Sequence, residues 1–202
     1  MSEFQAYLTL GFDHITDPNG YDHILFVIAL CAIYNFQDWK KVLVLITAFT
    51  VGHSITLALA TLQLITYSSS LIELFIPITI FITTLTNFAE SEKQDSKAPK
   101  LRYGLALCFG LIHGMGFSNY LRSLLGTQES IVIPLFSFNV GLEIGQLLIV
   151  TIALLIFTFF VELLKIKKVT WNHLISGIVA GMALSLILNN DLFRAFLGQS
   201  TE

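Results

Sequence analysis

Long apolar stretches restrict this chain to one class of fold. The hydrocarbon core of a bilayer is ~30 Å thick, so a spanning helix needs about 20 largely apolar residues. Hydropathy picks out six such stretches, near residues 20–36, 41–65, 70–88, 102–125, 131–160 and 171–190. Of the 202 residues, 54% are hydrophobic and only 12% are charged. We therefore expect one all-α integral membrane domain over residues 1–202, a polytopic bundle of six transmembrane helices.

The N-terminal segment 4–16 is too short to cross a bilayer. Phe4, Tyr7, Leu8 and Phe12 recur at a spacing that places them on one side of a helix. This pattern is typical of a helix that lies at the interface or re-enters the membrane. We expect such a short helix ahead of the first span, with His14 at a membrane surface.

Basic residues predict the orientation, because Lys and Arg accumulate in cytoplasmic loops. Nine of the eleven follow spans one, three and five, Arg102 among them, and only Arg122 and Arg194 lie on the other side. We expect a multi-pass protein of the cytoplasmic (inner) membrane with both termini outside and the hydrophilic segment 91–100 inside. The net charge of −3, with no basic cluster among aromatic residues, argues against nucleic-acid binding.

Ionisable residues inside the apolar stretches are the best candidates for function, since each costs ~2.5 kcal/mol or more at membrane depth. Three histidines, His23, His53 and His113, have polar or glycine neighbours. At a rise of ~1.5 Å per residue, His53 and His113 both lie ~17 Å from the cytoplasmic face. We expect these two to share a level within the bilayer.

The fifth span carries Asn139, Glu143 and Gln146, whose spacing puts them on one helix face. Asn139 reaches nearly the level of His53, and the other two lie successively closer to the cytoplasm. No span offers a Lys or Arg that would neutralise Glu143, so this carboxylate is either protonated or faces a cation.

Two further spans extend this set of polar groups. Asp22 and His23 belong near the outer rim with Glu73, and Asn87 continues the Glu73 face toward the inside. Together these residues predict a polar column that opens outward. Structural roles stay open for its members, because a histidine or amide can join helices by hydrogen bonds and Asp22 can cap a helix.

Three imidazoles with carboxylates suit a borderline divalent metal ion, Ni²⁺ or Zn²⁺ above all and also Co²⁺. Copper(I) fits poorly, because the chain has only three methionines and two cysteines that lie apart in the sequence. The predicted metal site therefore comprises histidine, carboxylate and amide side chains: His14, Asp22, His23, His53, Glu73, His113, Asn139 and Glu143. Gln146 and Asn87 would line the way inward.

Five ordered segments resemble the HupE/UreJ family of membrane proteins, which is associated with metal supply to hydrogenase and urease. They are residues 20–26, 49–57, 72–73 with Asn87, 109–117 and 138–146. The resemblance covers roughly residues 11 to 147 and implies a six- or seven-helix bundle that acts as a nickel or cobalt permease. Asp17 and Pro18 look like a two-residue insertion in the family pattern, between His14 and Gly20.

Two classes of function fit these residues. The first is a membrane transporter of divalent transition metals whose site opens to the outer face. The alternative is an intramembrane zinc-dependent hydrolase, in which three ligands leave a position for water and Glu143 acts as general base. The expected partners are the metal ion and the lipid bilayer, with a homo-oligomer or an outer-membrane or periplasmic metal-delivery protein left open.

Overall fold

The computed structural model describes residues 2–90, 98–125 and 130–198, and every regular element among them is a helix. This confirms the all-α class. In chain order the helices are α1 (Glu3–Thr16), α2 (Asp22–Cys31), η1 (Phe36–Asp38), α3 (Trp39–Thr61), α4 (Ser69–Glu90), α5 (Ala98–Leu125), α6 (Val132–Phe157), the π-helical η2 (Thr158–Leu163), α7 (Lys168–Leu188) and α8 (Asp191–Phe196).

Four helical stretches among the described residues are long and apolar enough to cross a membrane. They are η1 with α3 (Phe36–Thr61), most of α4 (Ser69–Ala89), α6 with η2 (Val132–Leu163) and α7 (Lys168–Leu188). The chain is therefore a membrane protein. That it has six spans remains a prediction. Of the expected cytoplasmic segment 91–100, residues 91–97 lie outside the described residues.

The predicted first span, residues 20–36, contains a much shorter helix than expected. α2 has 10 residues and is ~15 Å long, too short to cross a bilayer alone. It ends at Cys31, and Asn35 then caps a separate helical turn, its side chain accepting hydrogen bonds from the backbone N–H groups of Gln37 and Asp38. The apolar run continues past the end of α2 to Tyr34, so hydropathy alone overestimates the length of the helix.

The N-terminal helix α1 packs lengthwise against the first half of α6. Their backbones approach so closely that a Cβ on Gly141 would collide with the carbonyl of Leu8, and one on Gly11 with the carbonyl of Phe138. The side chains that α1 buries include Tyr7 and Ile15. Packing of α1 on α6 in this way holds His14, which is half-buried, against the centre of the bundle.

The most extensive helix pair is α3 with α5, and it is also joined through glycine. A Cβ on Gly110 would meet the carbonyl of Phe49, and one on Gly114 would meet that of His53. Such small residues let membrane helices approach closely where lipid gives no hydrophobic driving force. This contact brings the middle of α3 next to the middle of α5.

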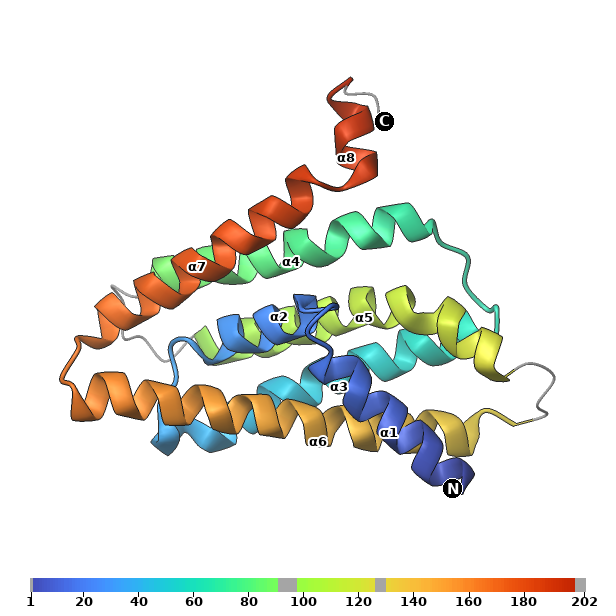
Figure 1. The fold of residues 1–202 in the computed structure, drawn as a ribbon, viewed down its shortest axis with the longest axis horizontal. Coiled ribbons are helices and arrows are strands. Elements are labelled where there is room, and N and C mark those ends of the chain that lie inside the picture. The colour runs from blue at the N-terminus through green and yellow to red at the C-terminus, as the bar shows by residue number, and fades with distance from the viewer. Residues whose placement is uncertain (1, 91–97, 126–129, 199–202) are drawn as a thin grey trace.

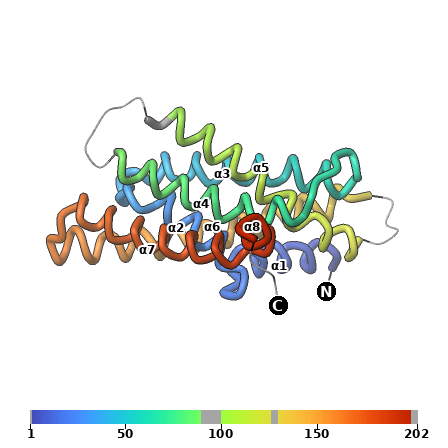
Figure 2. The backbone as a smooth tube through the Cα atoms, turned by 90° about the horizontal axis from the view of Figure 1, so that it is seen from above, coloured from blue at the N-terminus to red at the C-terminus, as the bar shows by residue number. Residues whose placement is uncertain are grey.

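Most of the helices run roughly along one long axis, with the starts of α3, α5 and α7 at one end and the starts of α1, α4 and α6 toward the other, while α8 stands across it (Figure 1). A view at right angles places α3 and α5 on one side of the bundle and α1 and α7 on the other (Figure 2). α1 and α2 follow one another in the same general direction, and the break between them lies near the middle of the bundle (Figure 1).

Candidate metal centre

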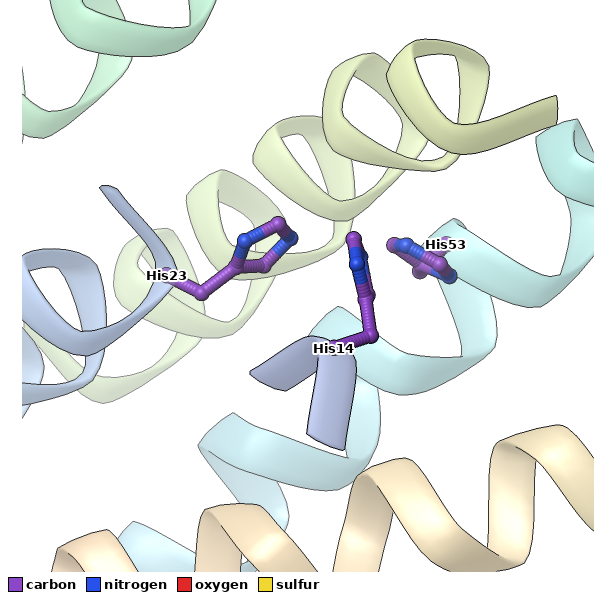
Figure 3. Close-up of side chains that lie close together, drawn as sticks. All are labelled: His14, His23 and His53. Atoms are coloured by element: carbon purple, nitrogen blue, oxygen red, sulfur yellow. The ribbon is translucent and has the colours of Figure 1, made fainter. Parts of the chain in front are cut away.

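Four histidines from four helices meet at this break. His14 is in the last turn of α1 and His23 in the first turn of α2, while His53 and His113 lie near the middle of α3 and α5. Ring centroids are 4.6 Å apart for His14 and His23, and 5.2 Å apart for His23 and His113. Figure 3 shows the ring of His14 between those of His23 and His53. We call these four residues the histidine cluster.

Three members of the cluster could bind one ion. A ligand nitrogen of each of His14, His23 and His53 lies within 4.8 Å of those of the other two. Two nitrogens bound to one ion at ~2.1 Å each are at most ~4.2 Å apart, so small side-chain adjustments would complete the coordination. The set is thus close to ligating geometry.

The nitrogens that would bind metal make no hydrogen bond to another described residue. Nε2 of His14, His23 and His113 and both ring nitrogens of His53 are buried without a hydrogen-bond partner among the described residues. A buried polar atom without a partner costs ~1–3 kcal/mol, which makes several in one place unusual unless they bind something. These lone pairs fit a metal ion of the borderline class.

Two of the rings are held with Nε2 free to ligate. Nδ1 of His23 lies 3.1 Å from Oδ1 of Asp22, and Nδ1 of His113 lies 2.8 Å from the carbonyl oxygen of Phe109. When Nδ1 donates its proton to such an acceptor, Nε2 keeps its lone pair. Asp22 is therefore placed to orient a ligand. Asp22 is not the N-cap of α2. That position is occupied by Tyr21, whose side chain makes no capping hydrogen bond.

Phenylalanine rings enclose the cluster. Phe117 lies 4.0 Å from the ring of His14, and Phe138 stacks on His53 at 6.2 Å. Phe49 and Phe26 approach His113 at 5.3 Å and 5.5 Å. An apolar shell of this kind limits water around the site and strengthens the interaction between an ion and its ligands.

The three polar residues of α6 bond to α3 or to their own helix, and Glu143 is not a member of the candidate ligand group. Glu143 accepts a hydrogen bond of 2.9 Å from Thr47, and Gln146 accepts one of 2.8 Å from Thr50. Asn139 donates to the carbonyl of Leu135, and its Oδ1 is buried without a partner among the described residues. The two threonines were not predicted as site residues; their spacing from His53, three and six residues before it, was the available signal.

Glu73 and Asn87, both on α4, are not brought to the histidine cluster. Glu73 is exposed and is not a member of the candidate ligand group. Asn87 is buried, where its Nδ2 donates to the carbonyl of Ala29 and to Ser176, and its Oδ1 accepts from Arg102. The amide therefore joins α2, α4, α5 and α7.

Arg102 is buried together with Asn87. Counted above with the cytoplasmic loop residues, it is only 4% exposed and directs both terminal nitrogens to Asn87 at 3.1 Å. Asn172 of α7 joins the same group by donating to the carbonyl of Asn87. A cation at the end of a span can turn inward when a buried amide receives it, and the charge pattern alone cannot distinguish the two positions.

One of three comparisons with known proteins found a match. The family model described as HupE / UreJ protein matches residues 1–190, nearly the whole chain. No curated protein and no solved structure matches the chain.

Proposed function

The chain belongs to the HupE/UreJ family, and from that premise we propose that it carries a divalent transition-metal ion across the cytoplasmic membrane through the histidine cluster. One observation carries the proposal: imidazoles from separate helices meet, and their buried ring nitrogens have no hydrogen-bond partner among the described residues. Neutral imidazole suits Ni²⁺, Zn²⁺ and Co²⁺. Of the two cysteines, Cys31 is buried and Cys108 exposed, and neither joins the candidate ligand group.

In this proposal α1 and α2 together form one discontinuous span. They contain 14 and 10 residues, ~36 Å of helix in total, about the thickness of a bilayer core. With α3 to α7 they account for six crossings and place both termini outside. The C-terminal end of α1 then points its negative dipole end at the ion, as broken helices do in many transporters.

The onward path runs along the contact between α3 and α6. Thr50 and Thr47 lie one and two turns from His53 toward the start of α3, and they pair with Gln146 and Glu143. These side chains would offer oxygen ligands on the cytoplasmic side of the cluster. Nε2 of Gln146 is buried without a partner among the described residues, which leaves this amide with unused hydrogen-bonding capacity. Asn87 is not part of this path, because its amide is already hydrogen-bonded to neighbouring helices.

The position of Glu143 favours transport over the hydrolase alternative. A general base must reach a water bound to the metal. The carboxylate of Glu143 instead accepts a hydrogen bond from Thr47 at the edge of the α3–α6 contact, where Thr47 is exposed and Glu143 is half-buried. Paired oxygen ligands beyond the cluster serve passage of an ion, and a hydrolase has no need of them.

Purified protein in proteoliposomes tests the proposal. We expect time-dependent accumulation of Ni²⁺, Zn²⁺ or Co²⁺ by vesicles that contain the wild-type chain, and loss of both accumulation and equilibrium binding in the His53→Ala variant. Metal accumulation no faster than in protein-free vesicles, for all three ions, would overturn the proposed function.

A further inference from the structure

A cavity of 560 Å³ adjoins His14, between the end of α1 and the part of α5 that follows His113. Asp13, His14 and Asp17 line it on one side, and Phe117 and Tyr120 on the other. We propose that this vestibule receives the hydrated divalent cation, with the carboxylates of Asp13 and Asp17 as its first ligands, and that His14 passes the ion to the histidine cluster. The inference rests on the proposed function and names the route of access and two residues for it.

The vestibule has room for an ion with its water. One water occupies ~30 Å³ in the liquid, so a first shell of about six waters needs ~180 Å³. The cavity is larger than this, whereas the cluster behind it is packed with the rings of Phe117 and Phe138. An ion that moves from one to the other must therefore exchange water for protein ligands at their boundary.

The two carboxylates give the vestibule a negative charge. Asp13 and Asp17 are both exposed, and neither forms an ion pair with another described residue. Oδ1 of Asp17 accepts hydrogen bonds from the backbone and side chain of Asn19, which fixes the carboxylate at the break after α1. A cleft lined by one sign of charge raises the local concentration of counter-ions and the rate of their association.

His14 connects the two compartments. It lines the vestibule, and its ring also lies 4.6 Å from His23 and 6.1 Å from His53. Its Nε2 is buried and has no hydrogen-bond partner among the described residues, an observation independent of the acidic residues that itself points to a ligand. Oxygen ligands at the surface followed by nitrogen ligands inside match the preference of a borderline ion as it loses water.

Stopped-flow absorbance of Co²⁺ binding to the detergent-solubilised chain tests the proposal. We expect the association rate of Asp13→Asn/Asp17→Asn to fall about tenfold at low ionic strength, and its salt dependence to disappear, because steering by the carboxylates is lost. The amount of Co²⁺ bound at saturation should stay at the wild-type level. The amide introduced by Asp17→Asn keeps an oxygen that can accept from Asn19, so the turn is preserved. Glu3→Gln, which removes one charge from the other end of α1, is the matched control.

Wild-type association rates in the double variant, or an equal loss in Glu3→Gln, would overturn the vestibule and leave the proposed function intact. Failure of the wild-type chain to bind any of Co²⁺, Ni²⁺ and Zn²⁺ would overturn both. Unchanged saturation binding in the double variant, together with slower association, separates access from a general loss of folding.

Discussion

The imidazoles of His14 and His23 lie 4.6 Å apart, centroid to centroid, across the break between α1 and α2. An ion that binds both rings therefore joins the two halves of the broken helix. His53 on α3 offers a nitrogen within 4.8 Å of theirs, so an ion bound by all three would also tie the N-terminal segment to the centre of the bundle.

Bound metal should consequently stabilise the fold. At a concentration of 100 Kd a ligand that binds only the native state adds ~2.7 kcal/mol, which raises Tm. We expect Ni²⁺ or Zn²⁺ to raise the Tm of the wild-type chain and of His173→Ala in detergent, and to leave that of His14→Ala unchanged. An equal rise in His14→Ala would contradict a site at the break.

Asp22→Asn should weaken metal binding without abolishing it. The carboxylate orients His23 and raises the basicity of its ring, and loss of such a partner costs ~10–100-fold in metal affinity. Equilibrium titration should give a higher Kd and an unchanged stoichiometry. Asp38→Asn, which removes a carboxylate paired with Lys41, is the control. Wild-type affinity in Asp22→Asn would show that the pairing has no part in ligation.

Gly110→Ala should destabilise the protein, because the new methyl group would collide with the carbonyl of Phe49 and push α3 from α5. Overpacking of this kind costs ~1–3 kcal/mol. Gly104→Ala on the same helix meets no atom within 4 Å and should be neutral or stabilising. The Tm of each variant in detergent measures the difference. A similar Tm for both would argue against close packing of these helices.

Cysteine labelling checks the orientation. In a chain with Cys31 and Cys108 replaced, we expect an impermeant maleimide to label Ser2→Cys on intact cells, and Lys167→Cys only after the membrane is opened. This follows from the accumulation of Lys and Arg in cytoplasmic loops. Labelling of Lys167→Cys from outside would reverse the direction proposed for the path.

Helical rise placed His53 and His113 at one depth, and both rings do meet that of His23 in the structure. His23 was selected for its polar neighbours but was expected near the outer rim, because the sequence does not show that its helix begins beside the middle of α3 and α5. The sequence alone could not place His14 in the bundle. A helix of 14 residues has the pattern of an interfacial helix, and only the structure shows that it packs on α6. Asn87 shows the same limit. Its depth fits a polar path, but its bonds to Arg102 and Ala29 depend on how three other helices pack around it.

Gln146→Leu tests the central claim most directly, because it changes the path and leaves the histidine cluster in place. Gln146 is bonded to Thr50, which also donates to the carbonyl of Ile46, so loss of the amide leaves the threonine with a partner. The measurement compares accumulation of Ni²⁺, Zn²⁺ or Co²⁺ in proteoliposomes with equilibrium binding on the same variant. We predict that accumulation stops while binding stays near the wild-type level. Wild-type accumulation with normal binding would contradict passage of the ion between α3 and α6.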